Sequence, residues 1–232
     1  AINKGFEKAT GEWIAWMNSD DCYLPDTLIP FFTKTNHEQF DFMHGLTTGG
    51  KTIDSRLYRQ INRNFKPDAF RVLLFFMGTE FIIPSQSVFV RRSLLQKVGF
   101  LREDLHYVMD MEWYARIYFG TEANRRLFYN YAICFFRKQP ASKTIGEVSG
   151  KMNAEACGVA TDMAPQLPIG QQRHLLKLVR ANLAFRQDFN KLKNFGDWLW
   201  LAAKYPLHVL YSRTLMARGK QLLRQVVGLK PL

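Results

Sequence analysis

Up to about residue 148, short apolar runs alternate with stretches of helical periodicity, and this alternation limits the possible folds more than any other feature. The runs are rich in aromatic and β-branched residues, as buried strands are. Strands that alternate with helices are typical of α/β proteins. We therefore predict a sheet flanked by helices, with strands at 13–17, 40–46, 51–58, 82–90 and 127–136 and helices at 2–9, 26–35, 67–76, 92–98 and 111–119.

After residue 148 only helical signals remain, and the balance of charge changes. Residues 1–150 carry 19 Lys/Arg and 16 Asp/Glu, whereas residues 151–232 carry 13 and 4. We therefore predict a first domain at 1–148 and a basic amphipathic helical tail at 149–232, with helices at 170–191, 195–204 and 207–227.

The last part of this tail, residues 195–232, combines basic residues with aromatic and aliphatic ones. A segment of this kind can lie on an anionic membrane surface. The alternative is a surface helix that packs its apolar face on the main domain and leaves its charges in water. The sequence leaves both interpretations open.

Composition excludes several classes of protein. The chain has 232 residues, of which 47% are hydrophobic, as expected for a globular protein with a sizeable core. Its three scattered cysteines fit a reducing compartment and argue against a disulfide framework or a zinc site. No apolar run is long enough to span a bilayer, and the first residues lack a secretory signal. We therefore expect a cytoplasmic protein.

The stretch Asn18-Ser19-Asp20-Asp21 follows the first predicted strand and precedes a predicted helix. Ligands of open α/β sheets bind at the carboxyl ends of strands, so an acid pair there has a good claim to function. Mg²⁺ takes carboxylate oxygens and shares its coordination with substrate phosphates. The same residue types also favour turns and helix caps, and spacing alone favours neither interpretation.

Three other polar features are candidates for function. Asp110 is placed like the N-cap of the helix at 111–119, where it either caps the helix or acts as a general base. Gln86 interrupts an apolar strand, and because buried polar groups need partners, either the strand edge is wet or Gln86 faces a ligand. The basic segment 137–144 could gather phosphate oxygens or form a solvated loop.

Taken in order along the chain, these segments resemble those of family 2 glycosyltransferases with the GT-A fold. The resemblance covers about residues 1–145 and rests on four segments: 1–12 with 18–21, 83–92 with 98–99, 110–116, and 136–144. It implies an incomplete GT-A domain with a Rossmann-like mixed sheet. The nucleobase-binding strands with which the family begins do not precede Ala1, so we expect an N-terminally truncated domain that binds nucleotide sugar weakly by itself.

The resemblance also implies roles for individual acids. Asp21 would ligate Mg²⁺ or Mn²⁺ bridging the donor diphosphate, and Asp20 would contact the ribose or share the metal. Asp110 would remove the proton from the attacking acceptor hydroxyl. A divalent ion stabilises a diphosphate leaving group as a Lewis acid, and a single displacement inverts the anomeric centre.

The remaining implied contacts are to the substrates. Arg137 and Lys143 would place positive charge at the leaving group, where it stabilises the transition state. Asn3, Gln86 and Glu112 are further candidates for substrate binding.

The predicted function is therefore transfer of a sugar from a nucleotide-sugar donor to a hydroxyl of a saccharide or lipid-linked acceptor, in surface polysaccharide or glycan assembly at the inner face of a membrane. A magnesium-dependent nucleotidyl or phosphoryl transferase could use the same acid pair, although no Gly-rich phosphate loop is present. The sequence is also compatible with a non-catalytic basic module and with an inactive fragment. No nucleic-acid-binding motif is visible, so we expect no nucleic-acid partner.

Overall fold

The computed structural model describes residues 1–50, 68–75, 83–137, 149–206, 223 and 226. It divides the chain into two compact units, Ala1–Leu176 and Lys177–Leu232. The predicted strand at 51–58, Lys143 and almost all of the predicted helix at 207–227 lie outside the described residues.

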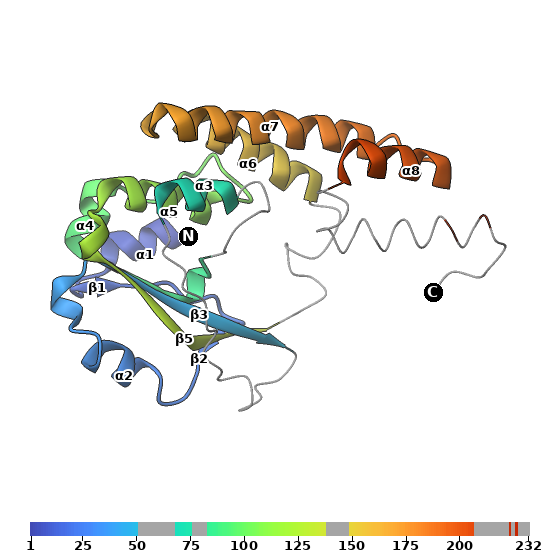
Figure 1. Ribbon diagram of the computed structural model, residues 1–232. Helices are drawn as coiled ribbons and strands as arrows, with labels where there is room; N and C mark the ends of the chain where they lie inside the picture. Colours follow the sequence, from blue (N-terminus) through green and yellow to red (C-terminus); the bar gives the residue numbers. More distant parts are fainter. Residues whose placement is uncertain (51–67, 76–82, 138–148, 207–222, 224–225, 227–232) are drawn as a thin grey trace. The chain divides into compact units, whose positions relative to one another are not determined.

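The first unit is built on a five-stranded mixed sheet (Figure 1). Across the sheet the strands follow the order β1 (Trp13–Ile14), β4 (Val88–Arg91), β3 (Phe42–Gly50), β5 (Arg126–Arg137) and β2 (Cys22–Tyr23). The pair β3 and β5 is parallel, and the other three pairs are antiparallel. The strands β1, β3 and β5 therefore run in the same direction, and their carboxyl ends lie at the same end of the sheet.

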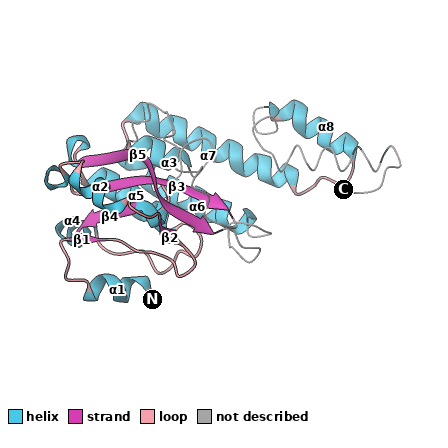
Figure 2. Ribbon diagram, turned by 90° about the horizontal axis from the view of Figure 1, so that it is seen from below, coloured by secondary structure: helices cyan, strands magenta, loops and turns pink. Residues whose placement is uncertain are grey.

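Helices and strands account for most of the described chain (Figure 2). The helices are α1 (Ile2–Lys8), α2 (Leu28–Thr33), α3 (Ala69–Phe75), α4 (Arg92–Val98), α5 (Met109–Gly120), α6 (Ser149–Met163), α7 (Ile169–Phe189) and α8 (Phe195–Lys204). The predicted helix at 92–98 is confirmed, and its end follows from Gly99, whose φ of 81° suits glycine at a helix C-cap.

Several predicted bounds were wrong for local reasons. The helix predicted from residue 26 begins at Leu28, because Asp26 has a φ of 57°, in the left-handed region. The strand predicted at 82–90 begins at Val88 and is preceded by a 3₁₀ turn, η3 (Ser85–Ser87). There the Ser87 hydroxyl donates to the carbonyl of Pro84 at 2.9 Å, a local bond that competes with strand pairing. The first strand covers two residues of the five predicted.

Helix α6 was missed because its sequence, rich in Gly and Ala, has a weak helical pattern. Its buried face includes Ala156, Val159 and Ala160. The helix lies in the first compact unit, so the division between units falls at 176/177 and not near 148.

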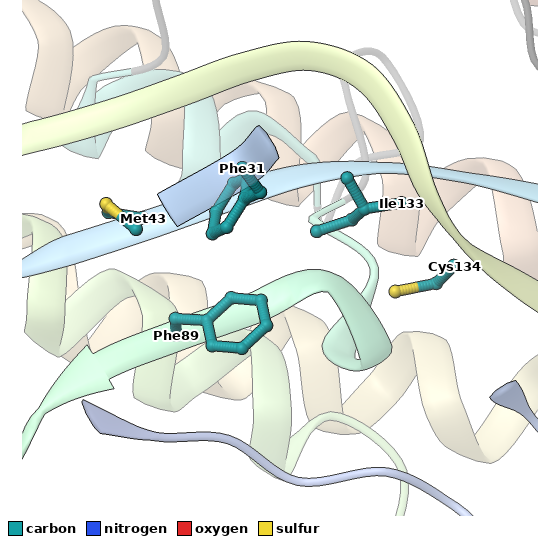
Figure 3. Close-up of a cluster of buried hydrophobic side chains, with 5 residues drawn as sticks. All are labelled: Phe31, Met43, Phe89, Ile133 and Cys134. Atoms are coloured by element: carbon teal, nitrogen blue, oxygen red, sulfur yellow. The ribbon is translucent and has the colours of Figure 1, made fainter. Parts of the chain in front are cut away.

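The core packs on both faces of the sheet, as strand alternation requires. On one face, Phe31 of α2 packs with Met43, Phe89, Ile133 and Cys134 (Figure 3). Burying each of these large side chains stabilises the fold by roughly 1.5–3 kcal/mol. Figure 1 shows α2 on this face and α5 on the opposite one.

On the opposite face, Phe42 and His44 of β3 meet the tyrosines of α5. The His44 ring is fully buried, and its Nε2 lies 3.1 Å from the Tyr118 hydroxyl. Burial lowers the pKa of His44 to about 3, so the ring stays neutral and forms part of the core. This packing fixes α5 against the sheet.

The second unit contains the end of α7 and α8, which bury Phe185 and Leu201 against Trp198 and Tyr205. Helix α8 begins with a capping box in which Asn194 and Asp197 satisfy each other's backbone N–H groups. Within the described residues, no helix has the length and apolar character needed to cross a membrane.

Candidate active site

Asp21 is the centre of a cluster at the carboxyl ends of the parallel strands. Its carboxylate is buried and accepts three hydrogen bonds, from Gln86 Nε2 at 2.6 Å, Asn18 Nδ2 at 3.1 Å and the backbone N–H of Arg137 at 3.1 Å. The donors come from the turn itself, from η3 and from the end of β5. The carboxylate thus joins three segments that are far apart in the sequence, and the predicted position at the strand ends is confirmed.

Gln86 is a partner of Asp21. Its side chain is buried and donates to the Asp21 carboxylate. Its backbone carbonyl accepts from Cys134 Sγ at 2.8 Å. Burial, the charge of Asp21 and the thiol of Cys22 raise the pKa of Cys134, which therefore remains a protonated donor. The amide of Gln86 thus holds Asp21, and its contact with substrate stays a prediction.

Asp20 lies in the same turn and is partly exposed. The described residues contain no group of three or more His, Cys, Asp or Glu side chains that could hold a metal ion. Such a group is not required for Mg²⁺, which one or two carboxylates hold together with substrate phosphates and water. Asp21 is buried whereas Asp20 is partly exposed, so Asp20 is the more accessible of the two to a cation that also binds diphosphate and water. The metal site itself stays a prediction.

Asp110 is the second residue of α5, and the N-cap position belongs to Val108. The predicted N-cap role of Asp110 was therefore wrong. Its Oδ1 accepts the N–H of Met111 at 2.8 Å, and no ion pair of Asp110 is seen in the described part of the chain. Burial raises the pKa of Asp110 to about 6, against the opposite effect of the backbone hydrogen bonds. A carboxylate with this pKa suits general base catalysis near neutral pH.

The turn η3 has one residue in the Asp21 cluster and another beside Tyr114 of α5. Tyr114 lies one helical turn after Asp110, and its hydroxyl is fully buried. Burial and the charge of Asp110 raise the pKa of Tyr114 well above its usual value, whereas the neighbouring Ser85 side chain has the opposite effect. Ser85 precedes Gln86, the partner of Asp21. The turn that holds Asp21 is thus also a neighbour of α5, the helix that carries Asp110, and the sequence pattern showed no role for Ser85 or Tyr114.

Glu112 has a structural role, and its contact with substrate stays a prediction. Its buried carboxylate forms a bidentate ion pair with Arg116, at 2.8 and 2.9 Å. The guanidinium of Arg116 also donates to the backbone carbonyls of Val98 and Phe100. These bonds tie α5 to the end of α4, and they leave Glu112 facing the protein.

Asn3 also has a structural role. Its side-chain amide donates to the carbonyl of Leu101 at 2.9 Å, and its side-chain oxygen accepts the N–H of the same residue at 3.1 Å. A further bond from the amide goes to Glu103. Both polar atoms of Asn3 thus form hydrogen bonds within the protein, and its contact with substrate stays a prediction.

Arg137 contributes to the cluster through its backbone, and its side chain is exposed at the end of β5. Two cavities, of about 350 and 330 Å³, lie beside α4 and contain none of the predicted site residues. The candidate site is therefore identified by its chemistry and not by a cavity.

Residues 1–99 match the family described as glycosyl transferase family 2. No match was found among curated proteins. Among solved structures, the chain is similar to TarS of S. aureus, with 14% identity and a TM-score of 0.56, covering 98% of this chain and 40% of TarS.

A second structure, S. aureus TarS 1-349 in complex with UDP-GlcNAc, is 15% identical with a TM-score of 0.54, covering 96% of this chain and 56% of that one. The chain thus spans between two fifths and three fifths of the length of these proteins. At such identities the similarity shows the fold, which agrees with the predicted mixed sheet flanked by helices. Residues 1–99 are thus similar to glycosyl transferase family 2, and the chain has a GT-A-like fold.

Proposed function

We propose that the chain is part of an enzyme that transfers a sugar from a nucleotide-sugar donor to a hydroxyl group of an acceptor. The observation that carries the proposal is a buried acid cluster at the strand ends together with Asp110 at the start of α5, whose pKa is raised to about 6. The similar structure of TarS 1-349 in complex with UDP-GlcNAc supports a nucleotide sugar as the class of donor.

Asp110 is the base in this reaction. It takes the proton of the acceptor hydroxyl while the hydroxyl oxygen attacks the anomeric carbon of the donor. The bond from that carbon to the diphosphate oxygen breaks, and its electron pair leaves with the diphosphate. A single displacement of this kind inverts the anomeric centre. A pKa near 6 keeps the carboxyl ionised at neutral pH and makes it more basic than an ordinary aspartate.

The carboxylate oxygens of Asp20 and Asp21 are of the kind that a hard divalent cation, Mg²⁺ or Mn²⁺, binds. Asp20 would hold the ion, and the hydrogen-bonded Asp21 would fix the turn that carries Asp20. When bound, such an ion neutralises negative charge on a diphosphate leaving group. The exposed side chain of Arg137, at the end of β5, would add positive charge there, as would Lys143.

We also propose that the second unit contacts an anionic membrane, which fits a lipid-linked acceptor in surface glycan assembly. Residues 177–232 carry eleven Lys/Arg and two Asp/Glu. Both acids form hydrogen bonds within the second unit. Asp188 accepts from Lys204 and Tyr205, and Asp197 belongs to the capping box. The remaining charge is strongly positive, so it complements anionic lipid headgroups.

Apolar side chains on α8 favour a lipid surface over nucleic acid as the partner. Leu199 and Trp200 are each 51% exposed, in a unit rich in basic residues. Aromatic and aliphatic groups of this kind insert at the headgroup boundary. The cytoplasmic face, with its anionic lipids and reducing conditions, suits both this surface and the free thiols Cys22, Cys134 and Cys157.

Product analysis tests the proposed reaction. The full-length protein is incubated with a panel of nucleotide sugars and hydroxyl acceptors, with Mg²⁺ or with a chelator, and products are identified by mass spectrometry and NMR. We expect release of nucleoside diphosphate and a product of inverted anomeric configuration, with both lost in Asp110→Asn. A product that carries phosphate would instead support a phosphoryl or nucleotidyl transferase.

Vesicle sedimentation tests the membrane contact. We expect the full-length protein to bind phosphatidylserine-containing vesicles more strongly than phosphatidylcholine vesicles, and Trp200→Ser with Leu199→Ser to weaken that binding. Ile29→Ser is the matched control, because Ile29 is 74% exposed but belongs to the first unit. Equal binding to both vesicle types, or equal loss in the control, would contradict the proposed surface.

A further inference from the structure

Glu155 of α6 binds the chain segment that leads into α5. Its Oε1 accepts the backbone N–H of His106 at 2.8 Å, and its Oε2 accepts those of Tyr107 at 2.6 Å and Val108 at 2.9 Å. One carboxylate therefore satisfies the N–H groups of three successive residues. Backbone N–H groups that precede a helix need such partners, and bonds to an ionised acceptor are stronger than bonds between neutral groups.

These three residues determine where α5 begins. Val108 is the N-cap of the helix, and Asp110 follows two residues later. Val108 is also buried, so its side chain and its N–H are both held. With the segment fixed on one side by packing and on the other by Glu155, the first turn of α5 has little freedom to rotate or unwind. The carboxylate charge is also favourable at this end of the helix, where the macrodipole is positive.

The contact links the start of α5 to a part of the chain that the sequence did not associate with the chemistry. Helix α6 lies beyond the segment that resembles the glycosyltransferase family, and 45 residues separate Asp110 from Glu155 in the sequence. Glu155 itself is one residue before the buried Ala156, so packing of α6 holds its backbone in place. Because the backbone of Glu155 is held in place, its carboxylate can hold the start of α5 in place as well.

We propose that Glu155 is a positioning residue for the catalytic base: it holds residues 106–108 so that α5 presents the Asp110 carboxylate at the acceptor hydroxyl. The inference rests on the proposed function, because it assumes that Asp110 is the base. It assigns to α6 a part in the reaction, although Glu155 acts through the backbone and touches neither substrate.

Two substitutions of Glu155 remove different numbers of its hydrogen bonds to residues 106–108. In Glu155→Gln, the side-chain oxygen can replace Oε2 and keep the bonds to Tyr107 and Val108, whereas Glu155→Ala loses all three. We expect kcat of the full-length protein to fall about 10- to 100-fold in the Ala variant, as misplacement of a reacting group does, and to fall less in the Gln variant. The KM for the nucleotide sugar should not change. Asp162→Asn, at an exposed acid of the same helix, is the control and should leave kcat unchanged.

A structural measurement separates this inference from the proposed reaction. In Glu155→Ala we expect faster hydrogen exchange at the amides of 106–108, and a change in the Asp110 carboxyl titration followed by NMR, whether or not a donor has been found. If the wild type transfers no sugar, the proposed function fails, and these two readouts still test the positioning role. Unchanged exchange and titration in Glu155→Ala, or equal loss of kcat in the Ala and Gln variants, would overturn it.

Discussion

The Asp21 cluster and the start of α5 each contain a carboxylate, but the two carboxylates have different surroundings. Asp21 is buried and accepts hydrogen bonds from a glutamine, an asparagine and a backbone N–H. Asp110 accepts from the backbone of its own helix, and burial raises its pKa to about 6. A carboxylate bound by several donors holds three segments together, whereas a desolvated one with few donors is suited to exchange a proton.

The same contrast is seen within one helix. Glu112 lies two residues after Asp110 and has an arginine one turn further on, with which it forms a buried ion pair. Position in the first turn of α5 is therefore not enough to make an acid reactive. The partner that the fold supplies decides whether the acid stabilises the structure or remains available for chemistry.

The largest expected effect comes from removing the base. Asp110→Asn keeps an oxygen that can accept from Met111 but cannot take a proton, so kcat should fall about 10²- to 10⁴-fold. Donor affinity, measured by calorimetry, should be retained. In the wild type, kcat should rise with pH through about 6 and then level off, as the carboxyl ionises. An unchanged kcat in Asp110→Asn would show that Asp110 is not the base.

Breaking the ion pair of Glu112 should have the largest effect on stability. Arg116→Ala leaves a buried carboxylate and two backbone carbonyls without their donor, so we expect a loss of about 3–5 kcal/mol in the free energy of unfolding. Chemical denaturation measures it. Arg102→Ala is the control: its partner Asp104 is exposed, and stability should hardly change. A small loss for Arg116→Ala would show that Glu112 is less dependent on its partner than the geometry indicates.

Asp21→Ala should cost stability, and Asp20→Ala should cost activity. The first variant leaves three donors without an acceptor at a buried position, for a loss of about 2–4 kcal/mol. The second should leave the midpoint of denaturation nearly unchanged and should weaken the dependence of turnover on Mg²⁺. Denaturation curves and metal titrations of both variants provide the comparison. If Asp21→Ala weakened the dependence on Mg²⁺ and Asp20→Ala did not, Asp21 would be the metal ligand.

The smallest expected effect is a gain in stability, in Asp110→Asn above pH 6. The pKa of Asp110 in the folded protein, about 6, lies above its ordinary value of 3.8, so the contribution of this carboxyl to stability is full below pH 4 and is lost as pH rises through 6. Asp110→Asn should therefore match the wild type near pH 4 and exceed it above pH 6, by on the order of 2 kcal/mol. Denaturation across this pH range measures the difference. A variant less stable at every pH would mean that the carboxylate is not strained by burial.

The parts of the fold that were predicted are those with strong local patterns. The sequence predicted the bounds of α4 and β5, which have regular apolar spacing, to within one residue. It also predicted that the turn from Asn18 to Asp21 lies at the strand ends. Misplaced bounds occurred where a local interaction overrides the pattern, as at Asp26 and Ser87. Helix α6 has a weak helical period, and it is stabilised by its contacts with the rest of the unit.

The sequence by itself determined the alternation of strands and helices, the position of Asn18 to Asp21 after a strand, the acids at the start of α5 and the basic character of the tail, because periodicity and charge are properties of neighbouring residues. Only the tertiary structure decided what each polar side chain does. Two of the three partners of Asp21 are 65 and 116 residues away in the chain, and Glu155 reaches residues 47 to 49 positions before it. Contacts over such separations depend on how the elements pack, and no local pattern encodes them.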